Sequence, residues 1–225
     1  YTTLFRSTHV LSVFPKGPHY LEWVKKHGFN SDYIAKQAAY AGTQVHQLCE
    51  EYLLGTELNF LDKNELPKYD LENWILFLRF VDFWETFKPT LLETEVHLFS
   101  DIYKIAGTCD IVCEIDGKIW IIDLKTSNAV QDVYEIQTSL YKQCYQECFG
   151  KEVAKTGILW LKSSSRGPDK SGQKIQGKNW QLIEPQRNFE YNIEIFKHIR
   201  AIFDLVNPKS QPNHISFPTI IKRKE

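Results

Sequence analysis

Two runs of alternating apolar and polar residues, joined by a short turn, form the clearest pattern in the chain. Residues 106–115 and 118–125 are these runs, and Asp116-Gly117 separates them. Asp-Gly between such runs is typical of a two-residue β-hairpin turn, because both central residues of that turn take φ > 0. A turn of this length also fixes the register of the two strands. The expected pairs are Ile115 with Lys118, Glu114 with Ile119, and Val112 with Ile121.

The same register places two acidic residues opposite each other at the open end of the hairpin. Asp110 lands opposite Asp123, and Lys125 shares their face because side chains alternate across a strand. Like charges at opposite positions destabilise a sheet, so the pair needs either a shared proton or a bound cation. Lys125 favours ionised carboxylates and therefore the cation. We expect a divalent metal with oxygen ligands here, and a solvated surface cluster is the alternative.

Helical and strand periodicities cover most of the remaining chain. Apolar residues at helical spacing predict a helix from Pro18 to Gly28, one from an N-cap at Ser31 to Gly55 that Gly42 interrupts, and others over 71–87, 130–149 and 189–206. Alternation predicts further strands over 93–100, 155–161 and 180–183. Residues 56–70 and the basic segment 162–178 are expected to be loops, and residues 207–225 a polar tail.

Together these elements predict an α/β fold with a small central mixed β-sheet flanked by helices. No linker or internal repeat divides the chain, so one domain over 1–225 is expected. It would comprise a helical part over 1–90, a core over 91–162, and a basic loop with a closing helix over 163–225.

Composition changes this picture little, but it limits the classes of protein. No run approaches the roughly eighteen apolar residues of a membrane span. The net charge is −1, so any contact with nucleic acid must be local rather than due to an overall basic field. The five cysteines are scattered and odd in number, which favours reduced thiols. We expect an intracellular protein, either cytoplasmic or in the mitochondrial matrix if a transit segment was removed.

Five short motifs that could carry chemistry follow one another along the chain. His46 lies at the edge of the apolar stripe of a predicted helix, and Glu95 shares one side of the next strand with Glu93. Gly107-x-x-Asp110, Asp123-x-Lys125 and Gln137-x-x-x-Tyr141 come next in that order. In order and spacing, the five motifs resemble the RecB-like exonuclease branch of the PD-(D/E)XK nuclease superfamily. Mitochondrial genome maintenance exonucleases and related phage exonucleases are the most similar in pattern.

The resemblance implies a restriction-endonuclease-like core and a metal-dependent phosphodiesterase that acts on DNA. Asp110, Asp123 and the carbonyl of Leu124 would hold Mg²⁺ or Mn²⁺. His46 would be a further ligand, and an imidazole suits Mn²⁺ better than Mg²⁺. Lys125 would orient the attacking water and stabilise the transition state. Glu95 is the better match to the acid on the first strand, although Glu93 is nearly as good.

The resemblance also implies contacts with the substrate. Gln137 and Tyr141 would touch the DNA backbone or the carboxylates, and a buried tyrosine with a satisfied hydroxyl is the alternative. Thr126 and Ser127, which follow Lys125 directly, are expected to bind the substrate as well. No cysteine follows Cys148, so no iron–sulphur cluster is expected.

The sequence therefore predicts an Mg²⁺- or Mn²⁺-dependent DNA exonuclease that prefers single-stranded ends, of the kind used in DNA repair and recombination. DNA is the expected partner, and no membrane is involved. Two alternatives stay open, namely a catalytically inactive nucleic-acid-binding module and an endonuclease of the same superfamily. The basic segment 162–178 would either follow the phosphates or remain a solvated loop.

Overall fold

A mixed β-sheet forms the centre of the computed structural model, which describes residues 4–168 and 175–212. Within these residues the sheet has seven strands in the order β1-β3-β4-β5-β7-β6, and β2 also pairs with β3. The strands are β1 (Phe5–Arg6), β2 (Thr90–Ser100), β3 (Ile105–Ile115), β4 (Lys118–Lys125), β5 (Lys155–Trp160), β6 (Ile175–Gly177) and β7 (Trp180–Ile183). The pairs β1–β3 and β4–β5 are parallel and the rest are antiparallel, which confirms the predicted mixed sheet.

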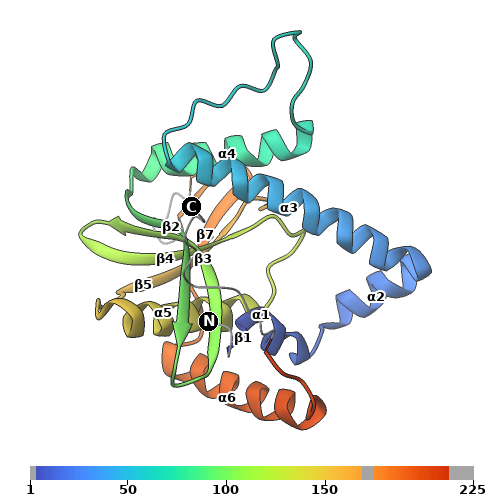
Figure 1. Cartoon of the computed structure of the whole chain (residues 1–225). Coiled ribbons are helices and arrows are strands. Elements are labelled where there is room, and N and C mark those ends of the chain that lie inside the picture. Colours follow the sequence, from blue (N-terminus) through green and yellow to red (C-terminus); the bar gives the residue numbers. More distant parts are fainter. Residues whose placement is uncertain (1–3, 169–174, 213–225) are drawn as a thin grey trace, which may run out of the picture.

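Helices cover both faces of this sheet (Figure 1). They are α1 (Ser7–Val10), the 3₁₀ turn η1 (Leu11–Val13), α2 (Pro18–His27), the 3₁₀ turn η2 (Gly28–Asn30), α3 (Ser31–Leu53), α4 (Leu71–Phe87), α5 (Val133–Phe149) and α6 (Phe189–Val206). Helices α3 and α4 lie over one face, while α5 and α6 lie over the other. None of the helices among the described residues combines the length and apolar character that a membrane crossing requires.

Each face of the sheet has its own apolar core. On the α3–α4 side, Ile111 and Ile122 pack with aromatic residues such as Phe80. On the α5–α6 side, Val112 and Ile121 pack with residues such as Phe196. Neighbouring positions on β3 and β4 therefore alternate between two buried faces. A sheet covered on both sides explains why these strands are almost continuously apolar.

The β3–β4 hairpin forms as the sequence predicts. Its ladder pairs Ile115 with Lys118, Glu114 with Ile119, and Val112 with Ile121. Asp116 and Gly117 both take positive φ, 51° and 71°, as a two-residue turn of this kind requires. Both the register and the turn are confirmed.

The predicted interruption of α3 at Gly42 is wrong. The helix runs unbroken from Ser31 to Leu53, and Ser31 is its first residue rather than its N-cap. A Cβ on Gly42 would lie 3.0 Å from Oγ1 of Thr126, which is closer than nearly all contacts of real Cβ atoms. Glycine therefore occurs here because the helix approaches the end of β4 closely, and not because the helix breaks.

The prediction of an exposed loop over 162–178 is also wrong at its end. Strand β6 lies inside this segment and pairs with β7. The hydroxyl of Ser165 donates to the carbonyl oxygens of Gly177 and Trp180, at 2.6 and 3.0 Å. Backbone pairing and the buried Trp180 order a sequence that contributes almost no apolar side chains itself. Residues 169–174 of the segment, and the predicted tail beyond residue 212, lie outside the described residues.

Candidate active site

The paired part of the β3–β4 ladder ends just before the two predicted acidic residues. Its last pair is Ile111 with Ile122, so Asp110 and Asp123 follow on adjacent strands without pairing as partners. Oδ2 of Asp110 instead accepts a hydrogen bond of 2.6 Å from the backbone N–H of Leu124. The carboxylate of Asp110 thus satisfies a backbone donor where regular strand pairing stops.

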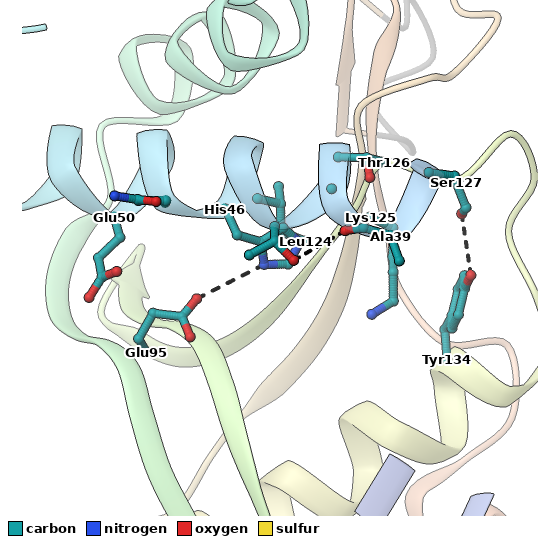
Figure 2. A pocket seen from close by; sticks show the side chains of 13 residues that line it. Ala39, His46, Glu50, Glu95, Leu124, Lys125, Thr126, Ser127 and Tyr134 are labelled. Carbon is teal, nitrogen blue, oxygen red and sulfur yellow. Dashed lines mark hydrogen bonds and ion pairs between the residues drawn. The ribbon is translucent and has the colours of Figure 1, made fainter. Parts of the chain in front are cut away.

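Three ligand-type side chains converge next to this point. Nδ1 of His46, on α3, lies 3.4 Å from Oδ1 of Asp110 and 4.0 Å from Oε1 of Glu95. One ligand atom from each of the three residues lies within 4.8 Å of the others. Figure 2 shows Glu95 reaching from β2 toward His46. A helix and two strands therefore bring one nitrogen and two carboxylates to one place.

The backbone of β2 explains why Glu95, and not Glu93, belongs to this cluster. Glu95 has a φ of 47°, which is the left-handed region that non-glycine residues rarely adopt. Such a residue costs about 1–3 kcal/mol and is typical of functional sites. It breaks the alternation of the strand, so Glu95 and Glu93 do not share a face. Burial first, and then the charge of Glu93, raises the pKa of Tyr145 on α5, on the other side of the sheet.

Lys125 and Asp123 form a buried ion pair beside the cluster. Nζ of Lys125 lies 2.6 Å from Oδ2 of Asp123, whose side chain is 2% exposed. The ammonium also lies 4.8 Å from the ring centroid of Tyr134, on α5. A cation over an aromatic ring is attracted to the face of the ring. The hydroxyl of Tyr134 donates to Oγ of Ser127 at 3.3 Å.

The protonation equilibria of the carboxyl groups reflect these neighbours. Burial, and after it the charge of Asp110, raises the pKa of Glu95 to about 7. Burial also raises the pKa of Asp123 to about 6, although Lys125 opposes this effect. Burial acts in the same direction on Asp110, but the charge and hydrogen bond of His46 hold its pKa below the usual value. The site therefore has one readily ionised carboxylate beside two that retain protons more easily.

The two basic groups respond to the same carboxylates. Burial disfavours the charged imidazolium of His46, but the neighbouring Asp110 outweighs burial and raises the pKa of His46. Burial likewise opposes the charged ammonium of Lys125, and the carboxylates of Asp123 and Asp110 outweigh it and raise the pKa of Lys125. Lys125 is consequently an ammonium throughout the physiological range.

A cavity of about 690 Å³ lies beside these groups, although neither Asp110 nor Asp123 is among its lining residues. Of the predicted site residues, His46, Glu95, Leu124, Lys125, Thr126 and Ser127 line it. The other lining residues are Ala38, Ala39, Gly42, Thr43, Gln47, Glu50 and Tyr134. Small residues of α3 therefore form one wall, and Tyr134 and Ser127 are joined across the other (Figure 2).

Gln137 and Tyr141 do not line this cavity. Both are buried on α5, and Nε2 of Gln137 donates to the hydroxyl of Tyr141 at 2.8 Å. The ring of Tyr141 packs on β3 so closely that a Cβ on Gly107 would lie 2.8 Å from its Cε1 atom. The glycine of the Gly107-x-x-Asp110 motif thus makes room for the tyrosine of the later motif.

Sequence reasoning missed Tyr134. It lies three residues before Gln137 and seven before Tyr141, which places all three on one side of α5. That spacing was visible in the sequence. An aromatic residue one turn before a Gln-x-x-x-Tyr motif lies on the same side of the helix, and this spacing would have indicated that Tyr134 belongs to the site.

The cluster suits a divalent metal ion. Ligands at about 2.0–2.1 Å from one Mg²⁺ ion are about 3–4 Å apart, so the three atoms need only small movements to share an ion. Mixed imidazole and carboxylate ligation is compatible with Mn²⁺, whereas Mg²⁺ prefers oxygen. Oδ2 of Asp123, which is buried, is satisfied by the ammonium of Lys125 at 2.6 Å, so the fit to a metal ion rests on the three converging residues. The residues present therefore fit a metal ion.

Comparison with known families agrees with this chemistry. The model of the PD-(D/E)XK nuclease superfamily matches residues 19–214. The chain belongs to this superfamily. Asp123-Leu124-Lys125 has the form of a (D/E)XK triplet, and Asp110 lies near it on the adjacent strand. The membership indicates a nuclease acting on nucleic acid, of a group that uses divalent metals.

Other comparisons add little to the membership of this PD-(D/E)XK chain. A solved structure titled "Crystal structure of SSO0001" is 14% identical and aligns over 79% of this chain and 90% of that chain, with a TM-score of 0.34. A likeness this distant supports no conclusion about function. The comparison with curated protein sequences gives no match.

Proposed function

We propose that the chain is an Mg²⁺- or Mn²⁺-dependent deoxyribonuclease that hydrolyses phosphodiester bonds as an exonuclease and prefers single-stranded ends. The observation that carries this proposal is the convergence of His46, Glu95 and Asp110 beside the ammonium of Lys125. A metal site next to a protonated lysine can supply the activated water and the charge stabilisation for phosphodiester hydrolysis. The exonuclease activity and the preference for single strands rest on the order of the five motifs.

The three converging residues hold the metal ion in this proposal. When bound, the divalent ion neutralises charge on the scissile phosphate and lowers the pKa of a coordinated water. Asp110 is the central ligand because its carboxylate is ionised and its position is fixed by the N–H of Leu124. Asp123 and the carbonyl of Leu124 are further ligands, in keeping with the family triplet.

Lys125 acts on the phosphate rather than on the metal. The side chain of Lys125 is 17% exposed on the wall of the cavity, and Asp123 and Tyr134 hold its ammonium in place. A fixed positive charge that faces the reacting phosphate stabilises the charge of the transition state, commonly by about 2.7–4 kcal/mol per group. Lys125 also orients the attacking water.

The remaining predicted residues take supporting roles. Thr126 and Ser127 line the cavity directly after Lys125 and contact the sugar–phosphate backbone. Gln137 and Tyr141 support the site from beneath β3, because they are buried and bonded to each other. They position the carboxylates rather than touch the DNA.

Digestion of labelled oligonucleotides tests this function. A 30-nucleotide single strand, labelled at its 5′ end in one sample and its 3′ end in another, is incubated with Mg²⁺, Mn²⁺ or EDTA. We expect products that shorten progressively from one end, only with metal, and no cleavage of a circular single strand.

Each other result has a definite meaning for the proposal. Cleavage of the circle would show an endonuclease. Absence of metal-dependent cleavage on every substrate, with DNA binding retained, would show an inactive binding module. Asp110→Asn serves as the control for contaminating nuclease, because the amide can still accept the hydrogen bond from Leu124.

A further inference from the structure

One side of α3 carries a stripe of exposed side chains that runs into the candidate active site. Its members are Tyr33, Lys36, Tyr40, Thr43 and Gln47, all exposed. Their spacing of three, four, three and four residues keeps them on one side of the helix. The last two members, Thr43 and Gln47, line the cavity. The stripe is therefore continuous with the active site.

The two tyrosines of this stripe have no partner in the part of the chain that the structure describes. Tyr33 is 66% exposed and Tyr40 is 64% exposed. Neither takes part in a hydrogen bond, ring contact or cation–π contact there. Such rings are flat apolar surfaces open to solvent, and unpaired bases stack on surfaces of this kind. In duplex DNA the base faces are already stacked on each other and cannot do so.

The charge around the tyrosines suits a polyanion. Lys36 lies between them, three residues after Tyr33 and four before Tyr40, and forms no ion pair within residues 4–168 and 175–212. Lys25 and Lys26 lie in the last turn of α2, which precedes α3. Helix α2 has no buried residues and lies against the start of α3, away from the sheet (Figure 1). Aromatic rings interleaved with lysines are typical of surfaces that bind single-stranded nucleic acid.

The length of the stripe gives the size of the strand that it fits. Tyr33 and His46 are thirteen residues apart in the helix, which corresponds to about 20 Å along its axis at about 1.5 Å per residue. A stacked strand rises about 3.4 Å per nucleotide, so this distance spans about six nucleotides. A strand of four nucleotides bound in the cavity would not reach both tyrosines.

We propose that this stripe is the track on which single-stranded DNA approaches the active site. Bases stack on Tyr33 and Tyr40, and Lys36 binds the phosphate between them. The strand then reaches the cavity past Thr43 and Gln47, whose side chains make polar contacts. This inference rests on the proposed function and extends it to the part of the substrate that is not yet being cut.

Binding without cleavage tests the track. Fluorescence anisotropy in EDTA measures the affinity of the full chain for a dT20 strand, a dT4 strand and a blunt 20-base-pair duplex. Loss of one stacked base by alanine substitution weakens binding at least about fivefold, so Tyr33→Ala/Tyr40→Ala should weaken binding of dT20 about 25-fold or more. Binding of the duplex should change less than threefold, and binding of dT4, which reaches Tyr40 but not Tyr33, should weaken clearly less than that of dT20.

Three further variants control this experiment. Tyr191→Ala removes a tyrosine that is 57% exposed on α6, over the other face of the sheet, and should leave binding of dT20 unchanged. Tyr33→Phe/Tyr40→Phe keeps both rings and should bind like the parent protein. Lys36→Gln should lower the slope of log affinity against log salt by about 0.7.

The proposal is overturned if the double alanine variant binds dT20 within threefold of the parent, or if Tyr191→Ala weakens binding equally. It is also overturned if the parent chain does not bind dT20, or if the phenylalanine variant loses binding. Metal-dependent cleavage is scored separately on dT4. If the double alanine variant binds dT20 like the parent while dT4 is still cleaved, the track is wrong and the proposed function stands. If the tyrosines are needed for binding dT20 but no substrate is cleaved, only the proposed function is contradicted.

Discussion

The two halves of the active site are built in opposite ways. On the α3 side, Nδ1 of His46 lies 3.4 Å from Asp110 and 4.0 Å from Glu95, and one ligand atom from each of the three residues lies within 4.8 Å of the others. On the α5 side, Asp123 and Lys125 are already paired at 2.6 Å and are largely buried. On the α3 side two carboxylates face one imidazole, whereas on the α5 side the carboxylate of Asp123 is already paired with the ammonium of Lys125.

This difference suggests a division of labour. Glu95 and Asp110 are two carboxylates that repel each other and are only partly buried, so they gain most from a bound ion, and the α3 side is the metal site. A buried lysine that is held by a carboxylate and a ring is a preorganised charge, so Lys125 serves the phosphate, and Asp123, its ion-pair partner and a proposed further ligand, joins the two sides. Substitutions on the two sides should therefore lose activity for different reasons.

The largest expected effect separates these reasons directly. Asp110→Asn should lower cleavage about a thousandfold or more and weaken Mn²⁺ binding, because the central ligand loses its charge. Lys125→Gln should lower cleavage about 10²–10³-fold and leave Mn²⁺ binding nearly unchanged. Initial rates and calorimetric Mn²⁺ titrations measure the two effects. Lys197→Gln, which breaks an exposed ion pair on α6, is the matched control and should alter neither.

If Lys125→Gln weakened Mn²⁺ binding as strongly as Asp110→Asn does, both sides of the active site would contribute equally to metal binding. The division of labour would then be wrong.

The pH dependence of metal binding should show a smaller effect. The pKa of Glu95 is raised to about 7, so this group carries a proton below that pH in the metal-free protein. A metal ion must displace that proton, and affinity for Mn²⁺ should therefore fall about tenfold per pH unit as pH decreases below about 7. Above about pH 7.5 this contribution should vanish. Mn²⁺ titrations between pH 5.5 and 8 measure it, and Glu95→Gln should give a flatter profile; an unchanged profile in that variant would exclude Glu95 as the cause.

Tyr134 should give the smallest effect of the series. Its ring faces the ammonium of Lys125, so Tyr134→Leu should lower kcat about tenfold with KM and Mn²⁺ affinity unchanged. Tyr134→Phe keeps the ring and should stay within about threefold of the parent. Phe189→Leu removes a comparable ring near Lys142, away from the site, and should not affect kcat. Equal kcat in the leucine and phenylalanine variants would show that the ring does not position Lys125.

Sequence reasoning predicted the parts of the fold that local patterns determine. The turn at Asp116-Gly117 fixed the register of β3 and β4, and dense apolar periodicity gave the bounds of α4 and α6. These features depend on residues close together in the chain, so the sequence contains them directly.

What sequence reasoning could not predict depends on contacts between distant segments. Gly42 indicated a helix break, because the approach of Thr126 to α3 is not visible in the sequence. Strict alternation likewise placed Glu93 and Glu95 on one side of β2, whereas the positive φ of Glu95 turns it to the cluster alone. Strand β6 was missed because its partner β7 and the buried Trp180 order it. Each error arose where tertiary structure overrides a local preference.

The position of a bound ion tests the central claim most directly. Crystals grown with Mn²⁺ and measured at the manganese absorption edge would give an anomalous peak for each ordered ion. The division between the two halves predicts a peak in contact with Asp110 and His46, which His46→Ala should weaken and Lys125→Gln should not. A peak bound only by Asp123, or no peak at this cluster at millimolar Mn²⁺, would contradict it.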